Sequence, residues 1–224
     1  MLNLLLLLAV GLALLDWFAV WNEYEQMNYL TKPGTLIAML AWFWTVGGMQ
    51  GILLWFGMAL VLSLVGDVLL LLPEKYFIFG LAAFLLAHVL YIIGFNQPLP
   101  QPSLPMYVLF LLVGALGMIL FAVIRAGLMH KESRRKLVTP VLVYSIAIEL
   151  MLFSALMTLF RADWQPIAAG LAASGGVLFF FSDSLLAYNR FVTVFTRARF
   201  WVRITYHLGQ LALVAAALLN FTVM

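Results

Sequence analysis

The sequence predicts an all-α protein, a polytopic membrane protein folded as a bundle of eight transmembrane helices. The first observation is its composition: 66% of the 224 residues are hydrophobic and 9% are charged, whereas soluble domains carry about 25% charged residues. The second is the arrangement of the apolar residues in long runs that short joints separate. We therefore expect a single transmembrane domain over residues 1–224, without a separate soluble domain.

A helix needs about 20 apolar residues to cross a bilayer, and eight segments meet or approach that length. The predicted spans cover residues 2–21, 31–46, 50–72, 76–95, 105–128, 137–160, 165–189 and 200–221. The first resembles a signal-peptide core, but no basic residues precede it and no small-residue cleavage pattern follows, so we interpret it as a span. Proline or glycine marks most joints, and Pro33 and Pro140 are expected to open the second and sixth spans.

The distribution of basic residues predicts the orientation. Eight spans place both termini on one side and the first, third, fifth and seventh loops on the other. These four loops and their flanks hold Lys32, Lys75, Arg125, Lys131, Arg134, Arg135, Lys136, Arg190, Arg197, Arg199 and Arg203, whereas the opposite side holds Arg161. The positive-inside rule therefore predicts cytoplasmic odd loops, with both termini outside the cytoplasm of a cell inner membrane. Basic residues confined to short loops do not indicate a nucleic-acid partner.

The two halves of the chain resemble each other. The segment SLVGDVLLLLP in the third span aligns with FFFSDSLLAYN in the seventh, which places Asp67 and Asp183 116 residues apart. His88 and His207, in the fourth and eighth spans, are 119 residues apart. This pattern predicts a four-plus-four parallel repeat. Chance similarity between two apolar stretches is the alternative interpretation.

Asp67 and Asp183 are the strongest candidates for a functional site. An acidic side chain at the centre of a membrane helix costs at least about 2.5 kcal/mol. Each aspartate lies six residues from the end of an apolar run, which corresponds to a depth of about 9 Å in a helix. We therefore expect both carboxylates in one polar cavity near the cytoplasmic boundary. Polar contacts that only join helices are the simpler alternative.

Other polar residues within the spans are candidates for the same site. They are Lys32, His88, Tyr91, Glu149, Ser182, Tyr206, His207 and Gln210. His88 and Tyr91 share a helix face because they are three residues apart, and Tyr206 and Gln210 do so because they are four apart. Ser182, directly before Asp183, is expected to be its hydrogen-bond partner. Glu149 and His88 are expected near the midplane.

The order and spacing of these residues resemble those of the YhhN-type lysoplasmalogenases over nearly the whole chain. The matching elements are the Lys32-Pro33 pair, Gly66-Asp67, His88 with Tyr91, the block FSDSLLAYNRF, and Gly209-Gln210 after Tyr206. Ala87, before His88, departs from the serine that the family pattern leads us to expect. The resemblance implies eight membrane helices and hydrolysis of the vinyl-ether bond of lysoplasmalogens. The products would be a fatty aldehyde and glycerophosphocholine or glycerophosphoethanolamine.

Paired carboxylates suit this reaction, because vinyl-ether hydrolysis needs a general acid and a group that stabilises an oxocarbenium-like cation. We assign these roles jointly to Asp67 and Asp183, with Glu149 as a further catalytic candidate. The substrate is then a single-chain ether lysophospholipid that enters from the membrane lipid, and no cofactor is expected. Its phosphate would lie near Lys32, and Asn189 of the FSDSLLAYNRF block joins the other polar candidates in binding it.

Two other functions remain open. His88, His207, Asp67 and Asp183 supply the ligand types of a zinc hydrolase, but the sequence has no HxxxH or HExxH pair and we predict no metal site. Intramembrane carboxylates in a repeated fold also suit a proton-coupled transporter or a lysolipid-binding protein. The predicted outer half is poor in charge, which favours a one-sided site over a transport path.

Overall fold

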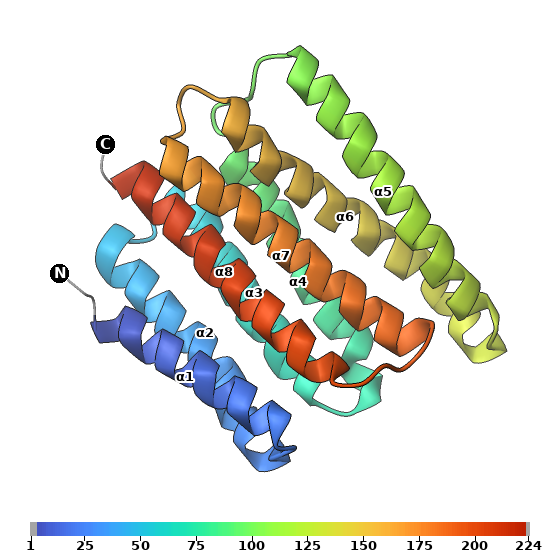
Figure 1. Cartoon of the computed structure of the whole chain (residues 1–224). Coiled ribbons are helices and arrows are strands. Elements are labelled where there is room, and N and C mark those ends of the chain that lie inside the picture. The colour runs from blue at the N-terminus through green and yellow to red at the C-terminus, as the bar shows by residue number, and fades with distance from the viewer. Residues whose placement is uncertain (1–3, 223–224) are drawn as a thin grey trace.

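The computed structural model describes residues 4–222 as a bundle of eight α-helices (Figure 1). They are α1 (Leu4–Trp21), α2 (Glu25–Gly47), α3 (Leu53–Leu71), α4 (Phe77–Phe95), α5 (Leu104–Met129), α6 (Val138–Met157), α7 (Pro166–Phe191) and α8 (Ala198–Thr222). Three short 3-10 helices, η1 (Glu74–Tyr76), η2 (Glu132–Leu137) and η3 (Thr158–Phe160), stand in the connections. The all-α prediction is confirmed, and the described residues contain no strand. Residues 2 and 3 of the predicted first span lie outside the described range.

Consecutive helices pack as antiparallel neighbours except α4 and α5, because α4 packs against α3 and α6. Helix α5 lies at one edge of the bundle against α6, with α1 and α2 at the other edge (Figure 1). Contacts between α4 and α6, and between α2 and α8, join the two halves of the chain. A four-helix repeat would produce both contacts, so the internal repeat stays a prediction with which this packing agrees.

Seven of the eight described helices are long and apolar enough to cross a membrane, and the exception is α2. The chain is therefore an integral, multi-pass membrane protein. Although α2 has 23 residues, enough for about 35 Å of helix, its first half carries polar residues at Glu25, Asn28, Thr31 and Lys32. Three of these four, Asn28, Thr31 and Lys32, are buried against neighbouring helices.

The start of α2 corrects the predicted second span. The helix begins at Glu25, six residues before the predicted start, and Pro33 lies inside it rather than opening it. The prediction followed apolarity along the sequence, but Asn28, Thr31 and Lys32 are buried in the protein interior, so these polar residues do not delay the start of the helix. Pro33 has no backbone N–H group, so the helix lacks one backbone hydrogen bond at this position. Around it, the Thr31 and Thr35 hydroxyls donate hydrogen bonds to the carbonyl oxygens of Met27 and Thr31, at 2.9 and 2.8 Å.

The close packing of α7 against α8 depends on glycine. A Cβ atom added to Gly175 would lie 2.9 Å from the backbone nitrogen of Leu213, and one added to Gly209 would lie 2.9 Å from that of Phe179. Real Cβ atoms do not approach backbone this closely, so the helices meet at this distance only because both side chains are absent. This contact sets the separation of the α7 and α8 faces that border the cavity described below.

Two ends of the bundle are distinguished from here on. The basic end carries the connections α1–α2, α3–α4, α5–α6 and α7–α8, which include η1 and η2. The opposite end carries the connections α2–α3, α4–α5 and α6–α7, which include η3. The described ends of α1 and α8 also lie at the opposite end (Figure 1).

Candidate functional site

A cavity of about 390 Å³ lies in the basic half of the bundle, lined by residues of every helix from α2 to α8. Its volume falls in the range of about 300–1,000 Å³ that is usual for small-molecule sites. One part of the wall is apolar and comes from α4 and α5, including Leu81, Phe84, Leu120 and Phe121. The remaining wall carries charged and polar groups from α2, α3, α6, α7 and α8. A cavity of this kind suits an amphiphile.

Asp67, on α3, is buried and forms an ion pair. Its side chain is 1% exposed, and the Lys32 ammonium nitrogen lies 2.7 Å from its Oδ1. The Tyr206 hydroxyl of α8 donates a hydrogen bond to Oδ2 at 2.9 Å. The Lys32 ammonium also lies 5.9 Å from the centre of the Tyr206 ring, near enough for a cation–π contact. Three helices thus meet at this carboxylate, which faces a cation.

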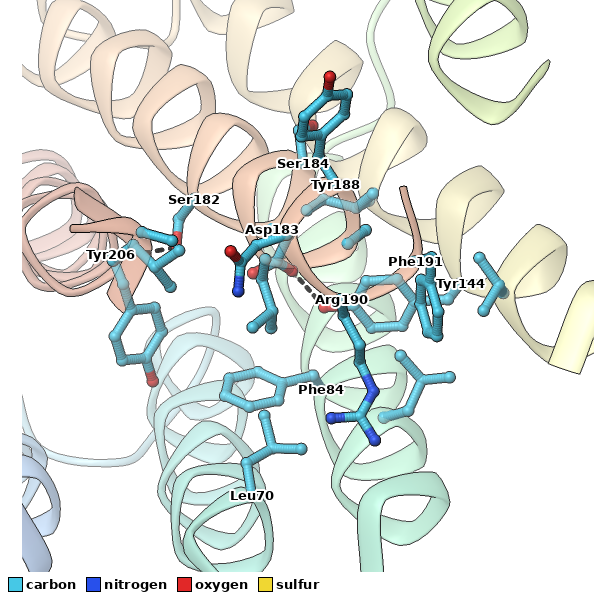
Figure 2. Close-up of a pocket in the computed structure, with 18 of the residues that line it drawn as sticks. Leu70, Phe84, Tyr144, Ser182, Asp183, Ser184, Tyr188, Arg190, Phe191 and Tyr206 are labelled. Atoms are coloured by element: carbon cyan, nitrogen blue, oxygen red, sulfur yellow. Dashed lines mark hydrogen bonds between the residues drawn. The ribbon is translucent and has the colours of Figure 1, made fainter. Parts of the chain in front are cut away.

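Asp183, on α7, has a more open environment. Its side chain is 14% exposed, and the Tyr144 hydroxyl of α6 donates a hydrogen bond to Oδ2 (Figure 2). His88 Nε2 on α4 lies 3.1 Å from the Tyr144 oxygen and 3.6 Å from Asp183 Oδ2. Among residues 4–222, no lysine or arginine pairs with Asp183. The two aspartates therefore line one cavity in unlike surroundings, one beside a lysine and one beside a phenol and an imidazole.

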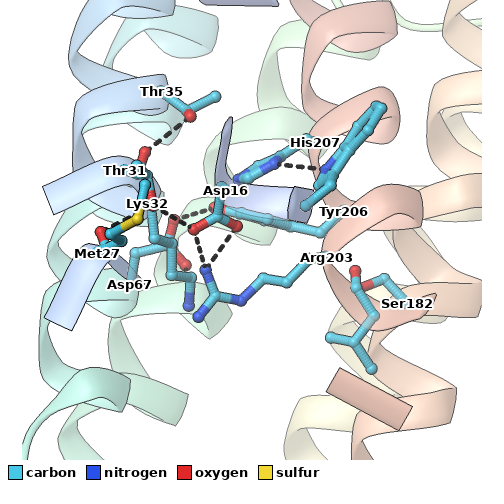
Figure 3. A network of polar contacts seen from close by, with 12 residues as sticks. Asp16, Met27, Thr31, Lys32, Thr35, Asp67, Ser182, Arg203, Tyr206 and His207 are labelled. Atoms are coloured by element: carbon cyan, nitrogen blue, oxygen red, sulfur yellow. Dashed lines mark hydrogen bonds and ion pairs between the residues drawn. The ribbon is translucent and has the colours of Figure 1, made fainter. Parts of the chain in front are cut away.

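A third buried carboxylate supports the wall from behind (Figure 3). Asp16 on α1 is fully buried and accepts hydrogen bonds from Arg203 Nη1, at 3.1 Å to Oδ1 and 2.9 Å to Oδ2. The Thr31 hydroxyl of α2 donates to Asp16 Oδ1 at 2.7 Å. Arg203 lines the cavity, so this network fixes one of its cations and ties α1, α2 and α8 together.

Sequence-predicted site residues fall into two groups. Those that line the cavity are Lys32, Asp67, Glu149, Ser182, Asp183, Asn189 and Tyr206. His88, Tyr91, His207 and Gln210 are absent from the wall. His88 contacts the Tyr144 hydroxyl through Nε2, as described above. The Tyr91 hydroxyl donates a hydrogen bond to Gln210 Oε1 at 2.6 Å, within the contact between α4 and α8.

Two contacts differ from those expected. His207 accepts a hydrogen bond at Nδ1 from the Trp17 indole at 3.1 Å, so it faces α1. Ser182 donates to the carbonyl oxygen of Val202 at 3.0 Å and has no contact with the neighbouring Asp183. Successive residues on a helix point about 100° apart, and Ser182 consequently faces α8 while Asp183 faces α6.

Glu149 occupies the part of the cavity near the middle of the bundle, where α6 faces α5. A Cβ atom added to Gly117 of α5 would lie 1.9 Å from the Glu149 carboxyl carbon. The carboxylate therefore occupies space that only glycine leaves open. No contact joins Glu149 to Asp67 or Asp183, so a catalytic role for it stays a prediction.

Sequence reasoning missed four residues around this site: Asp16, Asn28, Tyr144 and Arg203. Asp16 carried the same signal as the two chosen aspartates, because it interrupts the apolar run of α1. Tyr144 carried no signal, since a tyrosine in an apolar helix is common at membrane interfaces. Within residues 4–222, no group of three or more His, Asp or Glu side chains is arranged to hold a metal ion.

Comparison with known proteins gives consistent matches. The model of the YhhN family matches residues 27–217. Lysoplasmalogenase TMEM86B of Mus musculus is 34% identical over 91% of this chain and 82% of its own length. The protein of the same name from Homo sapiens is 31% identical over 90% and 81%. Lysoplasmalogenase of Mycobacterium tuberculosis is 33% identical over 62% of this chain and 50% of its own length. No solved structure matches the chain.

Proposed function

The chain belongs to the YhhN family, and we propose that it is a membrane hydrolase that cleaves the vinyl-ether bond of lysoplasmalogens. The products are a fatty aldehyde and glycerophosphocholine or glycerophosphoethanolamine. Relatives that match most of the chain are named lysoplasmalogenases. The observation that carries the proposal is a single amphiphilic cavity bordered by two carboxylates in unlike environments.

Asp183 is the proton donor in this mechanism. Tyr144 occupies its Oδ2, which leaves Oδ1 for the substrate. No lysine or arginine within residues 4–222 pairs with Asp183, whereas Asp67 has Lys32 at 2.7 Å from Oδ1 and the Tyr206 hydroxyl at Oδ2. A general acid must present a carboxyl oxygen to the substrate, and of the two aspartates we assign this role to Asp183 because its Oδ1 is not engaged.

The reaction then follows from the chemistry of a vinyl ether. Asp183 protonates the carbon β to the ether oxygen, the C=C electron pair forms the new C–H bond, and an oxocarbenium-like cation results. Asp67 supplies negative charge near this cation, as carboxylates do in glycosidases. Water adds to the carbon bonded to oxygen and gives its proton to Asp183. The hemiacetal collapses to the aldehyde and the glycerol hydroxyl, so the carboxyl group is regenerated.

The substrate lies with its headgroup toward the basic end. Arg190 and Arg199 line that part of the cavity, and each also pairs with an exposed glutamate, Glu74 or Glu25. The apolar wall from α4 and α5 holds the alkenyl chain. In this proposed pose, the ether linkage lies between the arginines and the apolar wall, at the level of the aspartates.

In the membrane, the basic end faces the cytoplasm and both termini lie outside it. The positive-inside rule supports this orientation through the distribution of lysine and arginine. A reporter fused after Met224 is expected to read outside the cytoplasm in a cell inner membrane. A cytoplasmic signal would reverse the orientation and move the site to the other leaflet.

Aldehyde release by purified protein in detergent tests the proposed activity. The wild-type protein is expected to release fatty aldehyde from a lysoplasmalogen, and not from the saturated 1-alkyl analogue, which lacks the C=C bond. In D₂O, one deuterium is expected on the carbon next to the aldehyde. Lysoplasmalogen binding without aldehyde release would favour a carrier or binding protein instead.

A further inference from the structure

Asn28 has a buried amide group that the fold leaves without a partner. It lies in the first turn of α2, is 2% exposed, and belongs to the cavity wall. Neither its amide nitrogen nor its amide oxygen has a hydrogen-bond partner among residues 4–222. Buried polar side chains in folded proteins are nearly always hydrogen-bonded, so each exception calls for an explanation.

The cations near Asn28 are already paired. Lys32 lies one helical turn deeper on the same face, about 6 Å along the axis, and pairs with Asp67. Across the cavity on α8, Arg203 pairs with Asp16 and Arg199 with Glu25. Among residues 4–222, Asn28 is therefore the buried wall residue on α2 whose side chain makes no hydrogen bond.

The chemistry of the Asn28 amide restricts which ligand group can satisfy both its hydrogen-bond donor and its acceptor. A primary amide offers both a donor and an acceptor, and a hydroxyl group matches both, whereas a phosphate diester only accepts. A lysoplasmalogen carries a single free hydroxyl on its glycerol backbone, at carbon 2. That carbon stands between the vinyl ether, placed at the aspartates, and the phosphate, placed at the basic end. Asn28, one turn closer to the basic end than Lys32, lies at the level this hydroxyl would occupy.

We infer that Asn28 hydrogen-bonds the free 2-hydroxyl of the substrate and thereby selects single-chain ether lipids over their 2-acyl counterparts. The inference rests on the proposed function for the identity of the ligand. A 2-acyl group has no donor for the Asn28 oxygen, so a two-chain lipid leaves that oxygen buried and unpaired. Sites built to hydrogen-bond a hydroxyl reject analogues without it far more strongly than apolar pockets reject a size change.

Binding of non-hydrolysable ligands tests the inference without catalysis. The ligands are two saturated 1-alkyl glycerophosphocholines, one with the 2-hydroxyl and one with hydrogen in its place, titrated by calorimetry into protein in detergent. Wild-type protein is expected to bind the hydroxyl ligand about 10–100-fold more tightly. Asn28→Ala is expected to bind both ligands equally, with the affinity of the wild type for the deoxy ligand.

Either of two results would overturn the inference. The first is equal binding of both ligands by the wild type, which requires no variant and therefore does not depend on the variant folding. The second is an Asn28→Ala protein that loses the same factor with both ligands, as a purely structural role would cause. Asn22→Ala is the matched control, because the Asn22 side chain is exposed and bonds the Phe18 carbonyl in the α1–α2 connection.

The outcome separates this inference from the proposed function. If the wild type distinguishes the two ligands but releases no aldehyde from a lysoplasmalogen, the proposed activity fails and the hydroxyl contact stands. If aldehyde is released equally fast from 2-hydroxy and 2-deoxy vinyl ethers, the activity stands and the assignment of Asn28 fails.

Discussion

The basic end and the opposite end of the bundle both carry buried charges, but they use them differently. At the opposite end, Arg161 donates hydrogen bonds to the carbonyl oxygens of Phe95 and Pro98, at 2.6 and 2.7 Å. It also donates to both carboxyl oxygens of Asp163, at 3.0 and 2.6 Å. The contacts with Phe95 and Pro98 join the α6–α7 connection to the end of α4 and to the α4–α5 connection. At the basic end, charged groups of similar type surround a cavity.

The difference shows which buried polar groups call for a functional explanation. Asn220 near the end of α8 accepts a hydrogen bond from the Gln165 backbone nitrogen at 2.9 Å. Around it, the ring centre of Trp164 lies 5.7 Å from that of Phe95 and 5.3 Å from that of Phe221. These groups pack together at the opposite end, although the Trp164 indole nitrogen has no hydrogen-bond partner among residues 4–222. Burial of a charge therefore does not mark a site, whereas an incomplete carboxylate or amide that lines a cavity does.

The largest expected effect comes from neutralising the two cavity aspartates. Asp183→Asn or Asp67→Asn is expected to lower kcat by about 10²–10⁴-fold, because asparagine neither donates the proton nor carries the charge that stabilises the cation. The measurement is aldehyde release at saturating substrate by variants with matched thermal stability. Asp163→Asn, the same change at the opposite end, is the control and should keep wild-type kcat. Near-normal turnover of both cavity variants would contradict the proposed acid–base mechanism.

Lys32→Gln tests whether the ion pair between Lys32 and Asp67 takes part in the reaction. Sequence alone assigned Lys32 to phosphate binding, which predicts a change in KM. The 2.7 Å contact with Asp67 indicates that kcat falls as well, and kcat/KM is expected to fall about 10–100-fold, the loss usual for a hydrogen bond to a charged group. Lys75→Gln, which removes the same charge at the basic end, should change neither constant. An increase in KM with unchanged kcat would indicate that Lys32 binds the substrate phosphate instead.

The helices and the carboxylates could be predicted from the sequence because each depends on a local property. A run of apolar residues predicts a span wherever it occurs, and an aspartate within such a run is costly enough to indicate a site. The start of α2 could not be predicted in this way, because Asn28 and Lys32 face a polar interior that apolarity does not detect.

The hydrogen-bond and ion-pair partners of the carboxylates could not be predicted from the sequence, because they depend on tertiary contacts. Tyr144 meets Asp183 from a helix 39 residues earlier in the chain, and nothing in its own segment distinguishes it from an interfacial tyrosine. Ser182 was the wrong choice of partner because adjacent helical residues diverge. The pairing of Asp16 with Arg203 spans 187 residues and joins two terminal helices that no local pattern connects.

Arg161→Gln tests the structural role of the opposite end. Glutamine lacks the charge and most of the donors, so the Phe95 and Pro98 carbonyls lose their partner. The free energy of unfolding is expected to fall by about 1–3 kcal/mol, measured as a lower Tm in detergent. Because Arg161 is remote from the cavity, kcat at temperatures well below the Tm should stay within twofold of wild type. A large loss of kcat at unchanged Tm would mean that the two ends are coupled.

The smallest effect is expected at Asp163, the exposed partner of Arg161. Hydrogen bonds from Arg161, together with its positive charge, hold the pKa of the Asp163 carboxyl below its usual value of about 3.9. A lowered pKa in the folded protein means that this contact stabilises the fold above pH about 4, and that the stabilisation disappears as the pH falls through the folded-state pKa. The Asp163 side chain is 40% exposed, so solvent screening limits the contribution to at most about 1 kcal/mol. Asp163→Asn should therefore lower the Tm slightly at pH 7 and by less near pH 3. A Tm difference that stays constant between these two pH values would show that the pair contributes through shape rather than charge.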